Sequence, residues 1–345
     1  MDSVTQAALG AAVGVAVMGR SRPLWQAALS GALVGTLPDL DVFIDQGDPI
    51  RNMVLHRAET HSLFLQTLAS PLIALPLAAL TRSLDLYRRW WLMVLLTLLT
   101  HSLLDAMTVY GTRIWLPFSD YPVGLGSIFI IDPLYTLPLL LGLSLTALSR
   151  LDSRRRWNAA GLALSTLYAA GSVAAQAHVE HKVQDAVIAA ELPVERVLVT
   201  PTPFNTVLWR ILLVGDDAYY EAFYSLLDPY TGPGRTIRFT RHERGRELDA
   251  KTTGFAKADL IRDFSKGFYA LRDTGRQIHI TDLRMGQHPY FVFSFAFAEH
   301  HSEPIAPIEP IHVRNRIPLR PGLAWLWRRL IGEDLPSPEG GSPAQ

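Results

Sequence analysis

The stretch SLFLQTLASPLIALPLAALT, residues 62–81, spans 20 residues and contains no charged side chain. A helix needs about 20 mostly apolar residues to cross the hydrocarbon core of a bilayer, so this stretch is typical of a membrane helix. Five other segments carry almost no charge: Ser3–Gly19, Pro23–Pro38, Trp90–Tyr110, Pro133–Ser149 and Trp157–Ala177. The sequence therefore predicts a multi-pass α-helical membrane domain of about six membrane-embedded helices, the first two of which form a tight, Gly- and Ala-rich pair that only partly crosses. A soluble all-helical core is the competing interpretation.

The texture of the sequence changes near residue 182. From there on, short β-branched and aromatic runs such as ERVLVTP and RTIRFTRHE alternate with turn-forming stretches such as DPYTGPGR. One helix is expected within residues 253–267. We therefore predict three parts: a membrane-embedded helical domain at residues 1–181, a soluble, mainly antiparallel β (α+β) domain at residues 182–331, and a disordered tail at residues 332–345.

Composition excludes some classes of site. Basic and acidic residues balance to a formal net charge of zero, so bulk electrostatics do not favour nucleic acid as a partner. The chain has no cysteine, which excludes disulfides and thiolate metal sites. Any metal is therefore expected to be held by imidazole and carboxylate groups. The beginning of the sequence, MDSVTQAALG, lacks the basic region of a cleavable signal, so we expect no segment that is removed.

Arginine is concentrated in three short connections, at residues 20–22, 82–89 and 150–156. Short basic connections belong on the cytoplasmic side of a membrane. The alternation that follows places connections 38–61 and 111–127 on the outer face. The β-rich domain is then expected on the same side, the periplasmic face of a bacterial inner membrane.

Acids and imidazoles from separate segments fall at the same predicted outer depth. Because His101 and Asp105 are four residues apart, they project from one face of a helix with Cβ atoms about 5–6 Å apart. An ionisable group in a membrane segment is a functional-site hypothesis by default. We predict a site for one or two divalent ions, Zn²⁺ above all, with Mn²⁺ or Fe²⁺ as alternatives. The candidate ligands are Asp39, Asp41, His56, His61, His101 and Asp105.

Each candidate also has a plainer interpretation. Asp39 and Asp41 follow Pro38 at a helix end, and the competing interpretation makes them capping carboxylates of a turn. Arg57 and Glu59 would serve equally in a solvated interfacial loop. A single buried histidine is more often a satisfied core residue than a ligand, and the neighbouring Asp105 is what favours ligation.

The function predicted from these residues is hydrolysis. A divalent ion lowers the pKa of bound water, which would then attack an ester or phosphoester of lipid or envelope material. Arg57 would bind the anionic group of that substrate, and Glu59 would act as the base. The alternative is a non-catalytic membrane carrier or scaffold in which the cluster is a transport or structural metal site. The lipid bilayer is the expected partner, and protein partners are not indicated.

Five segments together resemble the inner-membrane metal-dependent hydrolases of bacteria and archaea, some of which are described as LexA-binding or LexA-regulated. They are DSVTQAALGAAVG, GALVGTLPDLD, HRAETHSL, THSLLDAMTVYGT and IFIIDPLYTLPL. The resemblance implies a membrane-bound hydrolase whose divalent metal is held by these histidines and aspartates. The pair His101 and Asp105 is also distantly similar to the helix-borne His-x-x-x-Asp of zinc-dependent phospholipases C. Many relatives have histidine where Gln6 stands and glycine where Ala58 stands.

Overall fold

The computed structural model describes residues 1–151, 153–228, 237–300, 305–314 and 318–336. It divides the chain into two compact units. Unit 1 comprises Met1–Ile44, His56–Ala174 and Pro203–Asn205, and unit 2 comprises Asp45–Leu55, Ala175–Thr202 and Thr206–Gln345. The domain boundaries expected at residues 181 and 331 stay predictions, and most of the predicted disordered tail lies outside the described residues.

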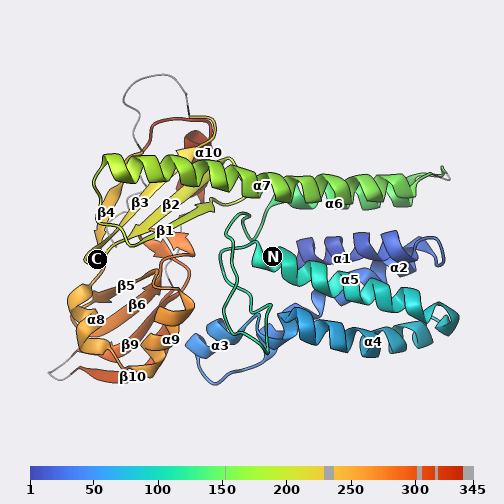
Figure 1. The fold of residues 1–345 in the computed structure, drawn as a ribbon, viewed down its shortest axis with the longest axis horizontal. Helices are drawn as coiled ribbons and strands as arrows, with labels where there is room; N and C mark the ends of the chain where they lie inside the picture. The colour runs from blue at the N-terminus through green and yellow to red at the C-terminus, as the bar shows by residue number, and fades with distance from the viewer. Residues whose placement is uncertain (152, 229–236, 301–304, 315–317, 337–345) are drawn as a thin grey trace. The chain divides into compact units, whose positions relative to one another are not determined.

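Unit 1 is helical (Figure 1). Its elements are α1 (Ser3–Met18), α2 (Leu24–Thr36), the 3₁₀ helix η1 (Pro38–Phe43), the 3₁₀ helix η2 (Glu59–His61), α4 (Leu63–Leu80), the 3₁₀ helix η3 (Leu84–Leu86), α5 (Tyr87–Ala106), α6 (Pro133–Leu148) and the first part of α7 (Arg155–Ala189). Helix α1 lies against α2, α5 and α6, while α4 pairs with α5. This arrangement brings both 3₁₀ helices η1 and η2 to one end of the α4–α5 pair.

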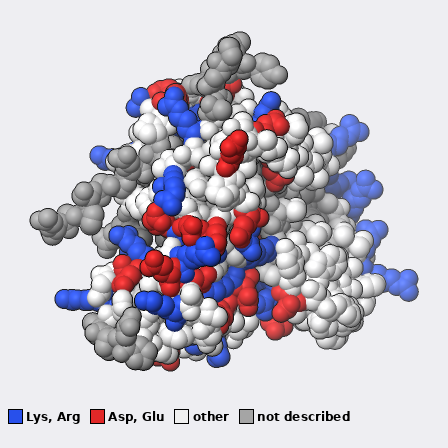
Figure 2. All heavy atoms as spheres, turned by 60° about the vertical axis from the view of Figure 1, so that its left-hand side comes forward, with Lys and Arg blue, Asp and Glu red and all other residues white. Residues whose placement is uncertain are grey.

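Basic and acidic side chains are interspersed on the face of the molecule drawn in Figure 2. The whole chain has equal numbers of the two, 32 of each. Neither sign dominates that face, and the expectation that nucleic acid is no partner stays a prediction.

Glycines set the close approach of α1 and α2. A Cβ added at Gly31 would lie 2.0 Å from the carbonyl oxygen of Gly10, and one at Gly14 would lie 2.2 Å from the carbonyl oxygen of Ala27. Atoms at such distances overlap, so any larger residue would force the helices apart. The tight pair expected for the first two segments is therefore present.

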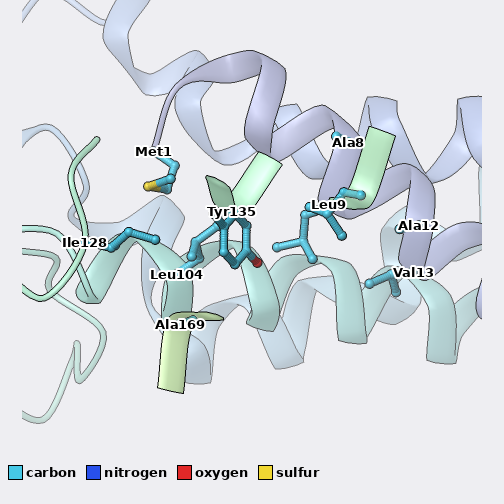
Figure 3. Close-up of a cluster of buried hydrophobic side chains, with 10 residues drawn as sticks. Met1, Ala8, Leu9, Ala12, Val13, Leu104, Ile128, Tyr135 and Ala169 are labelled. Carbon is cyan, nitrogen blue, oxygen red and sulfur yellow. The ribbon is translucent and has the colours of Figure 1, made fainter. Parts of the chain in front are cut away.

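An apolar core joins α1 to α5, α6 and α7 within unit 1 (Figure 3). Leu9 and Val13 of α1, Leu104 of α5 and Leu139 of α6 are all buried in it. The phenol ring of Tyr135 lies among them and is 5% exposed. This core packs the C-terminal part of α5, which carries His101 and Asp105, against α1.

The prediction of six membrane-embedded helices is wrong. Among the described residues only α4, Leu63–Leu80, is both long enough and apolar enough to cross a membrane. Helices α1 and α6 have 16 residues each and α2 has 13. At 1.5 Å per residue these reach only about 20–24 Å, short of a hydrocarbon core of about 30 Å. Helix α5 has the length, but Arg88, Arg89 and Asp105 lower its hydropathy.

The described part of unit 2 contains two antiparallel four-stranded sheets and one two-stranded hairpin, which confirms the prediction of mainly antiparallel β structure there. The first sheet has the order β1–β2–β3–β4 and the second β10–β9–β6–β5. The strands are β1 (Arg196–Pro201), β2 (Leu208–Val214), β3 (Ala218–Ser225), β4 (Thr240–Glu243), β5 (Tyr269–Asp273), β6 (Gln277–Asp282), β7 (Gly286–Gln287), β8 (Tyr290–Phe291), β9 (Ser294–Glu299) and β10 (Ala306–His312).

Helices cover these sheets. The C-terminal part of α7 packs Val179 and Val183 against Trp209 and Ile211 of the fully buried strand β2. The other helices of unit 2 are α3 (Pro49–Leu55), α8 (Arg246–Thr252), α9 (Ala256–Phe264) and α10 (Leu319–Leu330). Helix α9 lies within the residues 253–267 for which a helix was expected.

Candidate metal centre

Four side chains from three elements of unit 1 meet at one point. Asp39 lies in η1, His61 ends η2, and His101 and Asp105 lie one turn apart on α5. One ligand atom from each of the four lies within 4.8 Å of the others. The side chains of His61, His101 and Asp105 are almost wholly buried, and that of Asp39 is 19% exposed. Asp39 therefore marks the open side of this four-residue cluster.

The separations of the ligand atoms match a single coordination sphere. The Nε2 atoms of His61 and His101 are 3.1 Å apart. Asp105 Oδ2 lies 3.2 Å from His61 Nε2 and 3.6 Å from His101 Nε2. Asp39 Oδ1 lies 3.4 Å and 3.5 Å from the same two nitrogens. Ligands at about 2.0 Å from a tetrahedral Zn²⁺ are about 3.3 Å from one another, which these separations resemble.

The histidine tautomers follow from the partners of the Nδ1 atoms. His101 Nδ1 lies 2.7 Å from the carbonyl oxygen of Gly35, which can only accept, so this nitrogen carries the proton. The Thr60 hydroxyl donates to Asp41 Oδ2 over 2.8 Å and can therefore only accept from His61 Nδ1, 2.9 Å away. With the proton on Nδ1, each imidazole in its neutral form turns an Nε2 lone pair to the centre of the cluster, the arrangement in which histidine binds a metal.

The Nε2 atoms of the two histidines and the two carboxylate oxygens thus converge on one point as hydrogen-bond acceptors. Asp39 Oδ1 and Asp105 Oδ2 are buried, and neither forms a hydrogen bond of ordinary geometry with the described part of the chain. Burial would lower the pKa of His61, but the Asp105 and Asp39 carboxylates beside it raise that pKa above its usual value. Burial would likewise raise the pKa of Asp39, but the two imidazoles hold it well below its usual range. A cation would stabilise this group of acceptor atoms, and its two nitrogens and two oxygens suit Zn²⁺, Mn²⁺ or Fe²⁺.

The other carboxylate oxygen of Asp105, Oδ1, is bound by groups outside the cluster. Gln6 Nε2 donates to Asp105 Oδ1 over 3.0 Å, and the Met1 amino group also contacts this oxygen. Burial would raise the pKa of Asp105, but the positive charges of the Met1 amino group and of Arg57 hold it well below its usual range. Gln6 therefore orients a carboxylate of the cluster.

Arg57 is buried rather than open to a substrate. Its Nε lies 3.2 Å from Asp105 Oδ2, its Nη1 donates to Thr108 Oγ1 over 3.2 Å, and its side chain is 3% exposed. Its backbone adopts φ 63°, a left-handed conformation that costs a non-glycine residue about 1–3 kcal/mol. Such strain persists where the surroundings fix it, and here it directs the guanidinium at the cluster.

The other predicted site residues lie outside the four-residue cluster. Asp41 accepts from His56 Nδ1 over 2.7 Å, from the Arg57 backbone N–H over 3.0 Å and from Thr60. His56 is 21% exposed and pairs with Asp41. Glu59 is exposed at the start of η2. The roles of these three residues as ligands or base stay predictions.

Sequence reasoning did not assign the positioning role of three groups behind the ligands, although it had singled out Gln6. They are the Thr60 hydroxyl behind His61, the Gly35 carbonyl behind His101, and the Gln6 amide behind Asp105. A threonine placed directly before a candidate ligand histidine was the only signal for Thr60 that the sequence offered. The Gly35 carbonyl carries no side-chain signal, because it depends on where α2 runs.

A family model described as "YdjM inner membrane protein" matches residues 1–179, more than half of the chain. The chain belongs to this family. The matched residues include all four members of the cluster and most of unit 1. The description places the protein in an inner membrane, as the sequence predicted, and says nothing of hydrolysis. No curated protein and no solved structure matches the chain.

Proposed function

We propose that this member of the YdjM family is a membrane-bound metal-dependent hydrolase that cleaves an ester or phosphoester of lipid or envelope material. The observation that carries the proposal is the convergence of two imidazole Nε2 atoms and two carboxylate oxygens, all within 4.8 Å, with both histidine tautomers set for ligation. One divalent ion held there would supply Lewis-acid activation of a water molecule and of the scissile oxygen.

The side chains around the cluster have separable roles in this proposal. Asp39, the one partly exposed ligand, faces the side from which a substrate approaches. Arg57 is a positioning residue, because it neutralises and orients Asp105 rather than reaching solvent. Glu59 is exposed two residues before His61 and is the proposed proton acceptor.

Helix α4 supports attachment to the membrane. Its buried residues are Gln66, Ser70, Ala74 and Ala78, spaced four apart on one small or polar face. Four of its leucines are exposed instead: Leu68, Leu72 at 74%, Leu75 and Leu80 at 82%. A water-soluble helix would bury its leucines, so lipid is the proposed partner of this face. Arg82, Arg88 and Arg89 follow α4 and favour the cytoplasm for that end, and we propose on this ground that the cluster lies toward the outer end.

The segment that carries Asp39 and Asp41 is apolar on its outside. Leu40, Val42, Phe43 and Ile44 are all exposed, and Phe43 is 82% exposed. Apolar side chains gathered beside a site indicate contact with a membrane or an amphiphilic ligand. They are the reason to propose lipid or envelope material rather than a small soluble ester.

The second candidate is a structural metal site in a carrier or scaffold. Its support is the burial of three of the four ligands, because four protein ligands in a closed site are typical of structural zinc. A hydrolase must leave a coordination position open to water and substrate, whereas a structural site need not.

Hydrolysis by the purified full-length protein in detergent micelles tests the two against each other. The substrates are a phosphatidylcholine and bis-p-nitrophenyl phosphate, assayed after metal analysis. We expect turnover that Asp39→Asn abolishes and that Asp85→Asn, in the exposed 3₁₀ helix η3, leaves unchanged. Stoichiometric metal without turnover above the Asp39→Asn blank would refute the hydrolase and favour the structural site.

A further inference from the structure

Unit 2 contains a cavity of about 860 Å³. None of the four residues of the metal cluster lines it. Residues of β3, β4, β5 and β6 line it, together with His288, Pro289 and Phe291 of the β7–β8 hairpin. Its volume lies in the upper part of the range of about 300–1,000 Å³ found for ligand sites. The cavity therefore has room for a molecule larger than a few waters.

One wall of the cavity carries three aromatic groups with polar atoms. The Tyr219 hydroxyl lies 2.9 Å from His288 Nδ1, and the ring of His242 stacks on that of His288 with 3.9 Å between centroids. The backbone N–H of His288 donates to the buried carboxylate of Glu221 over 3.1 Å, which fixes this histidine. His242 Nε2 is buried and has no hydrogen-bond partner among the described residues. A buried polar atom without a partner is costly, and a ligand would remove that cost.

Some of the charged side chains that line the cavity have a partner of opposite charge among the described residues, and one does not. Arg241 pairs with Glu243, while Asp273 accepts from the Gly275 backbone and from His300 Nδ1. Arg272 lies directly across the β5–β6 pair from His279 and has no carboxylate partner in the described ranges of the chain. Its positive charge joins burial in lowering the pKa of His279 and of His288. The polar wall therefore presents one uncompensated cation and several potential N–H donors.

Apolar side chains also line this cavity. Leu271, Leu283 and Phe291 line it, and all three are buried in the apolar core of unit 2. A binding site that combines an apolar surface with a few placed polar groups orients a ligand by its polar end. An anionic end is favoured here, because Arg272 is a lining cation without a carboxylate partner among the described residues.

We propose that this cavity binds an organic anion, a phosphate or carboxylate attached to an apolar group. Arg272 and the Nε2 atoms of His242 and His288 hold the anionic end, and Leu283 and Phe291 contact the apolar end. The site is independent of the metal cluster, so it stands whether or not that cluster catalyses hydrolysis.

Isothermal titration calorimetry of the full-length protein in detergent micelles tests this proposal, with phenyl phosphate and benzoate as probes. We expect saturable 1:1 binding of at least one probe, weakened about tenfold or more by Arg272→Gln, since a charged hydrogen bond is lost. Arg276→Gln is the matched control, because it removes the same charge from the turn of the same hairpin outside the cavity lining.

The His101→Ala variant separates this site from the metal centre, where a phosphate or carboxylate could also bind. Binding of the probe should persist in that variant with unchanged stoichiometry. No saturable binding of either probe up to roughly 10 mM, equal effects of Arg272→Gln and Arg276→Gln, or loss of binding in His101→Ala would each overturn the proposal.

Discussion

Replacing His101 by alanine should remove the metal. Zinc sites with four protein ligands bind with apparent free energies of about 10–16 kcal/mol, so each ligand accounts for about 2.5–4 kcal/mol. His101 is one of four ligands in the cluster, and a tenfold change in affinity corresponds to about 1.4 kcal/mol. The affinity of His101→Ala for Zn²⁺ should therefore fall about 10²- to 10³-fold.

Competition with a fluorescent chelator measures this affinity, and elemental analysis measures the metal content after purification. His56→Ala is the matched control, since its imidazole pairs with Asp41 outside the cluster and its loss should cost less than about tenfold. His101→Ala also leaves the Gly35 carbonyl without its donor, so circular dichroism must show a folded protein. Asp39→Asn, which keeps the side-chain shape at the exposed ligand, gives a second test. Equal affinities in the wild type, His101→Ala and Asp39→Asn, or equal losses in His101→Ala and His56→Ala, would refute the cluster as the metal site.

Two further predictions concern packing and titration. Gly31→Ala should destabilise the protein by about 1–3 kcal/mol, because the new Cβ would lie 2.0 Å from Gly10 O. A Cβ added at Gly171 of α7 would have no atom within 4 Å, so Gly171→Ala should leave stability unchanged or raise it by up to about 1 kcal/mol. Thermal melts in detergent that show no difference between the two variants would contradict the contact between Gly31 and Gly10. Burial, with the charges of His288 and Arg210, lowers the pKa of His242 to about 4, so its NMR signals should titrate near that pH. Because the unfolded imidazole has a pKa of about 6.5, His242 should reduce stability as the pH falls from about 6.5 to about 4, and an NMR midpoint near 6.5 would refute this environment.

Local pattern was enough for several features. The uncharged run at residues 62–81 became α4, Leu63–Leu80, because no charge interrupts it, and the helix continues through Pro71 and Pro76. The glycines of the first two segments predicted a close helix pair, and the alternating runs after residue 182 predicted antiparallel sheets; both are present. The four-residue spacing of His101 and Asp105 placed both on one face of α5, since a helix repeats every 3.6 residues.

The lengths of the helices could not be predicted from the distribution of charge along the sequence. A segment poor in charge does not tell where its helix ends, and α1, α2 and α6 stop short of the length that a membrane crossing needs. Their ends are set by tertiary contacts and caps, such as the closure of α1 at Gly19 and the turn from α2 into η1. Six segments that look alike in composition therefore differ in the structure.

The sequence by itself determined which residue types the metal centre has and that a pair of them lies on α5. Only the tertiary structure decided which of the six candidates meet. Asp39 and Asp41 are two residues apart in a 3₁₀ helix, so they point about 120° apart around its axis. Asp39 consequently faces His61 and His101, while Asp41 turns to His56 and Thr60. The direction of a side chain depends on the path of the backbone, and that path is fixed by how α1, α2 and α5 pack together.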